Sequence, residues 1–413
     1  MNTRLNPRLG LGLAAVALCA IVFFASCGSK ETTEPQVLVV LTPDSTGVDL
    51  CGIFDIAAEV ENAEDTRIDW YVNDILGGND SLGTISQTNP AVYRAPSTVP
   101  HPADVAVRAV PEADPTQEAF CVITFKSTSV ARLYVNASIG SDETGTGCPG
   151  KPFKTITRAL AVADSGMTIQ VAPGLYDVAN GEHFPIQLRS GISLVGENWE
   201  TTIIRAGSLE VPIAVGLGRS HCALRKFTLE KEETLGDEFT TFVSTGPYNS
   251  DGLVDSIRVH QRANWSVMHI QGAHNTTVQN CYFVVEDGLH NSHGFQVVFG
   301  ALGTVIRNCT VRGFGNGLFF NTDVDPLMEG CTLEDNSRGA WLCCGGAGSN
   351  PNPDFGGGAR GSAGDNIIRN NLACGITNSG SSTVYAKYNT WTDDPPVAGH
   401  DYCDEGTGSI IVQ

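Results

Sequence analysis

Histidines, acidic residues and arginines are concentrated between residues 286 and 325, and side chains of these types could act on a polysaccharide. Carboxylate oxygens are the ligands that Ca²⁺ prefers, and a bound Ca²⁺ acidifies the proton beside a uronate carboxyl group, so that an arginine can remove it. Paired carboxylates could instead hydrolyse a glycosidic bond. The candidate residues for such a site are Asp287, His290, His293, Arg312, Asp323 and Asp325.

Two short motifs bear on the hydrolase interpretation. Asn321-Thr322-Asp323 and Ser292-His293-Gly294 resemble motifs of the polygalacturonases, but here the histidine motif comes first and the Asp-Asp pair of that family is absent, so we interpret the likeness as chance. His290 and His293 could bind a metal or relay protons, although a surface turn explains their spacing better. The sequence therefore leaves open whether the chain is an enzyme, and it predicts no cofactor unless a lyase reaction uses Ca²⁺.

The elements that would position these residues come from an internal repeat in the second half of the chain. The fourth residues of its copies stand at positions 227, 257, 281, 309, 331, 371 and 389, a spacing close to one coil of a parallel β-helix with loops of varied length. The widest gap contains the Gly-rich segment 345–364, which we expect to be a loop. The copies are Leu224–Leu229, Val254–Val259, Val278–Phe283, Ile306–Val311, Met328–Leu333, Ile368–Asn371 and Ala386–Trp391.

The pattern within each copy predicts a bend and two stacked columns. The first, fourth and sixth residues are mostly apolar, and such residues share one face of a strand only if the chain bends between the first and the fourth. The third residue is often Asn or Gly, which tolerate the left-handed conformation of a bend. Stacking then buries Cys281, Cys309 and Cys331 in one interior column. The second residues face outward as a solvated ion-pair ladder that stabilises little per pair: Arg225, Asp255, Gln279, Arg307, Glu329 and Arg369.

One short helix is expected in this half of the chain. Ile156, Ala159, Leu160 and Ala163 recur at helical spacing, which predicts an amphipathic helix over residues 155–164. The first rung of a solenoid needs a cover against edge pairing, so we expect this helix to cap it.

The motifs around this helix resemble a known family. Gly140-Ser141-Asp142, Pro152–Ile156, Val171–Tyr176 and Gly191–Gly196 are similar to the domain of unknown function DUF1565, within the pectin-lyase-like superfamily, and the likeness extends over most of residues 132–413. The resemblance implies an all-β right-handed parallel β-helix outside the cytoplasm. It implies no established activity.

Residues 35–128 predict a separate β-sandwich. Short alternating runs broken by turn residues, without a helical period, are typical of such a fold. Trp70 lies between Cys51 and Cys121 in the sequence, which predicts a disulfide Cys51–Cys121 around a buried tryptophan. The segment resembles bacterial Ig-like modules, and we interpret it as a rigid spacer.

The first residues predict export and a lipid anchor. Arg4 and Arg8 precede the apolar run Leu9–Phe24, and Phe24-Ala25-Ser26-Cys27 resembles a lipobox, with Phe24 where an aliphatic residue is usual. The boundaries are then a signal peptide over 1–26 and a tether over 27–34, with acylated Cys27 in the bilayer. An uncleaved transmembrane anchor is the alternative. The expected location is the cell envelope, on the periplasmic or surface side of the outer membrane.

Charge and cysteine content narrow the partners. The net charge is −20 and becomes 23 − 45 = −22 once Arg4 and Arg8 leave with the signal, which disfavours nucleic acid as a partner. Of the 13 cysteines, Cys19 lies in the signal and Cys27 is the lipid site, so the odd number left means at least one unpaired thiol within the folded chain. The oligomeric state stays open.

Two classes of function remain. The first is a non-catalytic surface protein that binds carbohydrate or a neighbouring surface, or has a structural role. The second is a polysaccharide lyase or glycoside hydrolase on the flank of the β-helix. The same solenoid can host either function, and the missing catalytic motifs favour the first.

Overall fold

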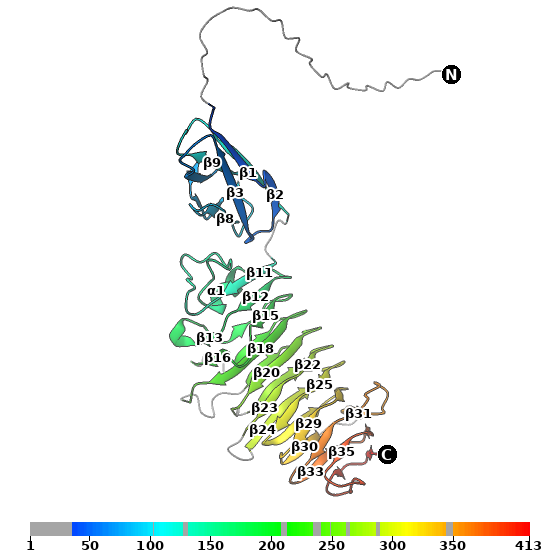
Figure 1. Cartoon of the computed structure of the whole chain (residues 1–413). Helices are drawn as coiled ribbons and strands as arrows, with labels where there is room; N and C mark the ends of the chain where they lie inside the picture. Colours follow the sequence, from blue (N-terminus) through cyan, green and yellow to red (C-terminus); the bar gives the residue numbers. More distant parts are fainter. Residues whose placement is uncertain are drawn as a thin grey trace, which may run out of the picture.

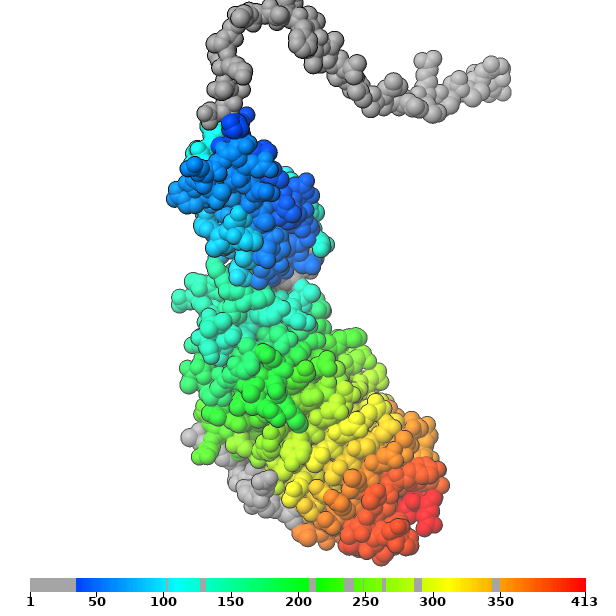
Figure 2. Space-filling model, in the orientation of Figure 1, coloured from blue at the N-terminus to red at the C-terminus, as the bar shows by residue number. Residues whose placement is uncertain are grey.

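The computed structural model describes residues 35–101, 103–126, 131–207, 213–233, 241–247, 249–261, 265–285, 290–343 and 350–413, with the backbone alone for 290 and 291. The molecule is elongated: a β-sandwich forms one end, and a parallel β-solenoid extends from it to the C-terminus (Figures 1 and 2). The predicted all-β fold, a β-helix preceded by a sandwich, is confirmed.

The sandwich consists of two five-stranded sheets around a core that includes Trp70, Tyr93 and Val107. Buried and accessible residues alternate along Val105–Pro111, as expected for a strand with one face on the core. The first sheet has the order β1 (Leu38–Thr42), β3 (Ile53–Glu61), β8 (Ala91–Arg94), β7 (Gly83–Ile85) and β6 (Gly78–Asn79). The second has the order β2 (Ser45–Val48), β10 (Ala119–Phe125), β9 (Val105–Pro111), β4 (Ile68–Val72) and β5 (Ile75–Leu76).

The solenoid is built from an 18-stranded sheet and a nine-stranded sheet whose strands pair in parallel. The larger sheet contains β11 (Arg132–Val135), β12 (Thr168–Val171), β13 (Gly174–Tyr176), β15 (Ser193–Gly196), β16 (Thr202–Ala206), β18 (Ala223–Lys231), β20 (Leu253–Val259), β22 (Thr277–Gln279), β23 (Tyr282–Val284), β25 (Val305–Arg307), β26 (Thr310–Arg312), β28 (Leu327–Glu329), β29 (Thr332–Glu334), β31 (Asp354–Gly356), β32 (Ile367–Arg369), β34 (Thr383–Ala386), β35 (Thr390–Trp391) and β37 (Ser409–Ile411).

The nine-stranded sheet forms another flank of the same coils. Its strands are β14 (Ile186–Gln187), β17 (Ile213–Leu217), β19 (Thr241–Thr245), β21 (Ser266–Gln271), β24 (His290–Val298), β27 (Phe314–Asn321), β30 (Arg338–Cys343), β33 (Cys374–Asn378) and β36 (Tyr402–Asp404).

The repeat predicts the register of the larger sheet correctly from residue 224 to residue 333. Leu224 pairs with Val254, Val254 with Val278, Val278 with Ile306 and Ile306 with Met328. The predicted bend is confirmed, because the third residue of each copy has a positive φ between 52° and 63°, as at Lys226, Ser256, Asn280, Asn308 and Gly330. Cys281, Cys309 and Cys331 are free, buried thiols in the core, as expected.

Three predictions about the next coil are wrong. The Gly-rich segment contains a rung, because β31 pairs with β28 and β34. In this coil the residue equivalent to Cys331 is Asn366 and not the predicted Asn371. The Cys331 N–H donates to Asn366 Oδ1 (2.9 Å), and Leu333 pairs with Ile368. Arg369 is therefore aligned and ion-paired with Glu334. It does not follow Glu329 in the predicted ion-pair ladder, which lies one strand away. The prediction failed because Asn370-Asn371 has the sequence typical of the predicted bend but lies at the next corner of the same coil.

The helix α1 (Ile156–Val162) lies beside the first rungs, two residues shorter at its C-terminal end than expected. Thr155 caps its N-terminus through Oγ1, and the carboxylate of Glu182 accepts from the backbone N–H groups of Ile156 and Thr157. A 3₁₀ helix, η1 (Val178–Asn180), precedes Glu182. In the ranges given above, no helix is both long and apolar enough to cross a membrane.

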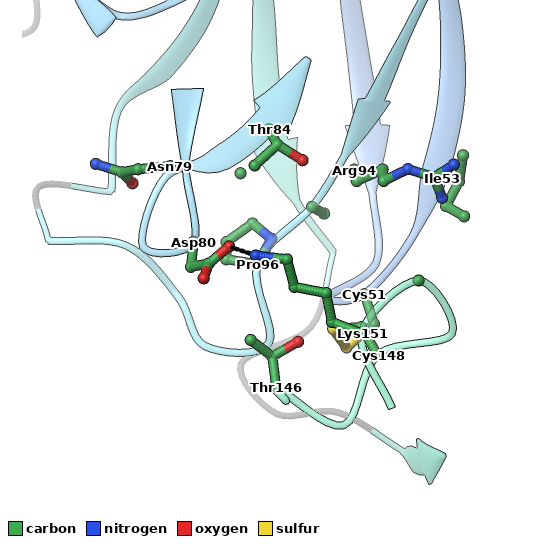
Figure 3. Close-up of a pocket in the computed structure, with 13 residues that line it drawn as sticks. Cys51, Ile53, Asn79, Asp80, Thr84, Arg94, Pro96, Thr146, Cys148 and Lys151 are labelled. Carbon is green, nitrogen blue, oxygen red and sulfur yellow. Dashed lines mark hydrogen bonds and ion pairs between the residues drawn. A yellow bond between two sulfur atoms is a disulfide. The ribbon is translucent and has the colours of Figure 1, made fainter. Parts of the chain in front are cut away.

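A disulfide joins the sandwich to the solenoid, and it corrects the predicted Cys51–Cys121 pair. Cys51 bonds to Cys148, while Cys121 is a free, buried thiol in the sandwich core. Cys51 lies between β2 and β3 at the end of the sandwich that faces the first solenoid loop, so it is out of reach of the middle of β10. Asp80 and Lys151 form an ion pair across the same small cleft (Figure 3). Trp70 is buried as predicted.

Candidate functional site

Part of the nine-stranded sheet has an outward face that combines aromatic and polar side chains. Met268 and Ile270 belong to the solenoid core, so His269 between them points outward. His269 is aligned with Gln296, Gln296 with Phe319, and Phe319 with Trp341 across β21, β24, β27 and β30. A second row lies beside the first and contains His293, Asn316 and Arg338.

We call this surface the sheet-face strip. It comprises Trp265, His269, His293, Gln296, Asn316, Phe319, Arg338 and Trp341.

Ring contacts hold the strip together. Trp265 stacks on His269 with ring centroids 5.3 Å apart, and His293 stacks on Phe319 at 4.7 Å. Phe319 meets Trp341 edge to face at 5.3 Å, and the Arg338 guanidinium carbon lies 5.1 Å from the centroid of the Trp341 ring. Phe319 also packs with Val298 and Cys343 in a small apolar cluster separate from the solenoid core. The rings therefore form two stacked groups, one of Trp265 with His269 and one of His293, Phe319 and Trp341.

The two histidines of the strip are uncharged near neutral pH. Burial, with a smaller contribution from His269, lowers the pKa of His293 to about 4. Burial also lowers the pKa of His269. The Asn316 Nδ2 group lies 3.2 Å from His293 Nδ1, which suits a neutral imidazole that accepts at this nitrogen. Both rings therefore act as hydrogen-bonding groups rather than as cations.

Several polar atoms of the strip are buried without a hydrogen-bond partner among the described residues. They are His269 Nε2, Gln296 Oε1 and Asn316 Oδ1, on side chains that belong to residues only 8%, 5% and 7% exposed. Thr377 Oγ1, aligned with Trp341 in the next strand, is in the same condition. An unmade hydrogen bond at a buried atom costs about 1–3 kcal/mol, so a polar partner at these atoms would be favourable.

Among the predicted site residues whose side chains the structure describes, only His293 lies in this strip. Arg312 is half-exposed on the larger sheet and pairs with Asp335 (Nε–Oδ2 3.0 Å). Asp325 accepts from the Gly303 N–H (2.7 Å) and pairs with Arg360 (3.5 Å). Asp323 lies in a left-handed turn after β27. The predicted cluster of acids around an arginine base is therefore not formed by Arg312, Asp323 and Asp325.

The remaining predicted residues are described in part or not at all, and the backbone of His290 and His293 lies in β24 and not in the predicted surface turn. Asp287 and Cys27 lie outside the described residues, and for His290 the description covers the backbone alone.

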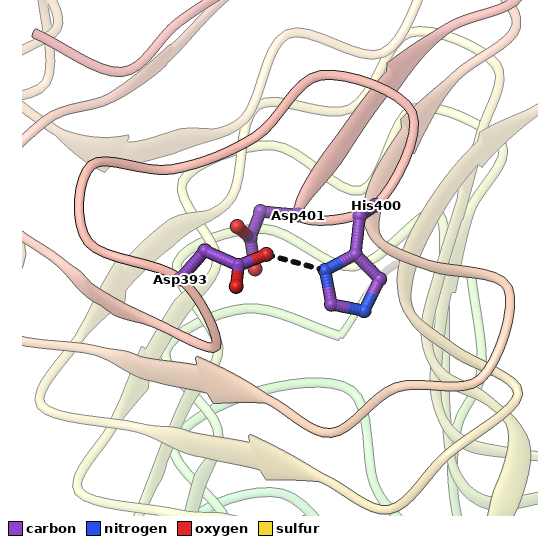
Figure 4. Close-up of side chains that lie close together, drawn as sticks. All are labelled: Asp393, His400 and Asp401. Atoms are coloured by element: carbon purple, nitrogen blue, oxygen red, sulfur yellow. Dashed lines mark hydrogen bonds and ion pairs between the residues drawn. The ribbon is translucent and has the colours of Figure 1, made fainter.

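A different group of side chains lies near the C-terminus. The ligand atoms of Asp393, His400 and Asp401 lie within 4.8 Å of one another, a grouping that could hold a metal ion (Figure 4). Asp401 accepts backbone N–H groups of Thr392 and Val397, and His400 Nδ1 lies 2.7 Å from Asp393 Oδ2. These contacts close the loop between β35 and β36, which gives the three residues a structural role.

A spacing in the sequence could have predicted part of the strip, although our predictions of the site used only catalytic motifs. Phe319 and Trp341 each follow the core cysteine of their coil by ten residues, since 319 − 309 and 341 − 331 are both 10. Their equal distance from a known core position places them in one outward row. Gln296 follows Cys281 by 296 − 281 = 15 residues, so the longer loop of that coil hides the same alignment.

Comparison with known families identifies the solenoid. Residues 138–398 match the family described as "Protein of unknown function (DUF1565)". The chain belongs to the DUF1565 family. The family resemblance predicted from the motifs of residues 133–196 is thereby confirmed, and the strip lies within the part of this DUF1565 member that matches.

Solved structures with some similarity to this DUF1565 chain are all remote. The mannuronan C-5 epimerase AlgE6 A-module of Azotobacter vinelandii has 16% identity and a TM-score of 0.36, over 62% of this chain and 72% of its own. A rhamnogalacturonan lyase has 16% identity and a TM-score of 0.43, over 62% and 74%. The GH136 lacto-N-biosidase of Eubacterium ramulus has 10% identity and a TM-score of 0.40, over 68% and 67%. A search of curated proteins found no match.

Proposed function

We propose that the sheet-face strip binds a glycan and that this DUF1565 protein presents it at the cell envelope as a non-catalytic, lipid-anchored binding protein. One observation carries the glycan assignment: aromatic rings lie directly beside buried polar atoms that have no hydrogen-bond partner among the residues that the structure describes. His269 Nε2 and Gln296 Oε1 stand in the same outward row as Phe319 and Trp341.

A sugar matches both parts of this surface. Its ring has faces of C–H groups, which pack against an aromatic ring, and an equatorial rim of hydroxyl groups, which donate and accept hydrogen bonds. A purely apolar ligand would leave the buried oxygens and nitrogens of the strip unsatisfied. A purely ionic ligand would find few charges, because both histidines are neutral near pH 7.

The dimensions of the strip favour an oligosaccharide over a single sugar. Adjacent strands of a sheet lie about 4.8 Å apart, so the three steps from β21 to β30 extend over about 14 Å. Trp265 beside β21 is 49% exposed and Trp341 on β30 is partly exposed, so a ring is accessible at each end. We expect the glycan to lie along the solenoid axis.

The remainder of the chain suits such a role. Acylation of Cys27 would hold the protein on the membrane, and the sandwich would act as a spacer between membrane and solenoid. The disulfide Cys51–Cys148 supports this arrangement, since it ties the spacer covalently to the first solenoid loop.

The test is binding to a panel of polysaccharides and oligosaccharides with and without Ca²⁺. Trp265→Ala removes the most exposed ring of the strip, and we expect at least a tenfold loss of affinity for any glycan that the native protein retains. Trp199→Ala is the matched control, because Trp199 is a partly exposed tryptophan beside the larger sheet, where it contacts Arg258. An equal loss in both variants, or none in either, would remove the strip from the binding site.

The same samples are read for reducing ends and for unsaturated uronate products. Retention without product is expected. Product formation, especially with Ca²⁺, would replace the non-catalytic proposal with the lyase or hydrolase alternative.

A further inference from the structure

Arg338 is an arginine without an ion pair among the described residues, and its contact is with an aromatic ring of the strip. Eight arginines lie within 4 Å of an Asp or Glu oxygen in the described parts of the chain: Arg67, Arg108, Arg205, Arg225, Arg307, Arg312, Arg360 and Arg369. Arg338 has no such ion pair and no hydrogen bond with any described residue. Its guanidinium instead stacks on the ring of Trp341. In a chain of net charge −20, an unpaired arginine is not explained by a shortage of acids.

The position of Arg338 places a cation at one end of the sheet-face strip. It begins β30 and is aligned with Asn316, whose Oδ1 atom is buried and has no hydrogen-bond partner in the described parts of the chain. Its side chain is partly exposed, so the guanidinium remains accessible. Stacking on Trp341 engages the face of the guanidinium and leaves its N–H groups, which lie in its plane, free to donate.

Glu405 is the described acid that hydrogen bonds connect to Trp341, and its contact is with a serine and not with Arg338. Trp341 Nε1 donates to Ser379 Oγ (3.0 Å), and Ser379 Oγ donates to Glu405 Oε2 (3.0 Å). Glu405 therefore serves the serine beside Trp341 and forms no ion pair with Arg338. Since His269 and His293 are neutral, Arg338 is the single permanent cation of the strip.

We infer that Arg338 binds the carboxylate of an acidic sugar residue, so that the preferred ligand is a glycan carrying a uronic acid or another carboxylated sugar at the β30 end of the strip. This inference rests on the proposed glycan binding and specifies its ligand class. A guanidinium matches a carboxylate with two parallel N–H···O bonds, and its support on an aromatic ring limits the side-chain entropy lost on binding.

The experiment uses trimers of galacturonate, glucuronate and mannuronate, each compared with its carboxyl-reduced, neutral counterpart, on the complete protein by calorimetric titration. The native protein should bind at least one acidic trimer about tenfold or more tightly than its neutral counterpart, the effect expected for a charge-assisted hydrogen bond. Arg338→Gln should remove this preference, because it should weaken binding of the acidic trimer about tenfold more than binding of its neutral counterpart. Arg338→Lys, which keeps the charge without the planar fork, should restore the preference only in part.

The control is Arg258→Gln, because Arg258 also lies against aromatic rings, Trp199 and Tyr282, but on the other sheet. It should behave like the native protein. Equal binding of acidic and neutral trimers by the native protein would overturn the carboxylate assignment while leaving glycan binding intact. An equal loss of both ligands in Arg338→Gln would overturn it too, since the side chain would then only support Trp341. No binding of any trimer or polysaccharide would overturn both proposals.

Discussion

The imidazole of His293 lies flat on the phenyl ring of Phe319, with ring centroids 4.7 Å apart and planes inclined by 17°. The two residues belong to different outward rows and to adjacent strands, β24 and β27. Their contact joins the polar row, which ends at Arg338, to the aromatic row, which ends at Trp341. It also shields one face of the His293 ring from water, and burial lowers the pKa of this histidine to about 4.

The lowered pKa of His293 predicts a loss of stability in acid. The unfolded chain takes up this proton near the ordinary pKa of 6.5, whereas the folded protein resists protonation until about pH 4. The contribution of His293 is therefore complete above pH 6.5 and is lost as the pH falls from 6.5 to 4, with a slope of at most about 1.4 kcal/mol per pH unit. His293→Gln should flatten the fall in unfolding free energy over this window, measured by urea denaturation. His183→Gln, at an exposed histidine before β14, should leave the slope unchanged, and an identical slope in both variants would contradict the assignment.

Two disulfides join pairs of described cysteines, and we expect them to stabilise the fold to different extents. Cys51–Cys148 closes a loop with a sequence separation of 97, and Cys374–Cys403 one of 29. On the chain-entropy account these loops correspond to about 4.7 and about 3.6 kcal/mol. Paired Cys→Ser variants should each lower the melting temperature in calorimetry, with the larger change for Cys51/Cys148. A melting temperature that is the same with and without Cys51–Cys148 would show that non-covalent contacts alone hold the sandwich against the solenoid.

Asp354 should be essential for the coil that the sequence did not predict. It is buried, and its carboxylate accepts from the backbone N–H groups of Gly356, Gly358, Arg360 and Ser362. Asp354→Ala leaves these donors without their acceptor, so we expect a loss of about 2–4 kcal/mol in unfolding free energy. Asp354→Asn keeps one acceptor oxygen and should lose less. Asp365→Ala, in the same segment, is the comparison, and equal losses at both positions would contradict a specific role for Asp354.

The lipid anchor is tested at Cys27. Cys27→Ser prevents thioether formation, so we expect its N-terminal peptide to lack the acyl mass and to keep residues 1–26, because cleavage at a lipobox follows acylation. Cys19→Ser, inside the predicted signal, should be acylated and cleaved like the native protein. If the native protein itself carries no acyl mass on Cys27 and keeps residues 1–26, the apolar run Leu9–Phe24 is an uncleaved anchor instead.

Loss of the lipid anchor should not affect glycan binding. Binding experiments on the Cys27→Ser protein should give the affinities of the native protein, because the strip residues all lie beyond position 264 in the solenoid.

Most of the solenoid follows from local features of the sequence. The bend at Asn280 and Asn308 needs only a residue that tolerates positive φ, and the burial of Cys309 follows from its position in a two-residue period. The first turn of α1 could be predicted for the same reason, because Thr155 caps it through a bond to Arg158, three residues along the chain. Where neighbouring copies carry different motifs, as at Asn366 and Asn371, local features were ambiguous, and the register was decided by hydrogen bonds to residues 35 positions away.

The sequence by itself determined the coil and its core column, because both depend on a short motif repeated along the chain, and it indicated the family through the motifs of residues 133–196. Tertiary structure decided the partner of Cys51, the rung at Asp354 and the sheet-face strip. Stacking brings together residues as far apart as Trp265 and Trp341, and the loops between coils differ in length, so no fixed interval marks an outward row. The charge state of His293 was decided in the same way, since it depends on burial against Phe319 and not on any neighbour in the sequence.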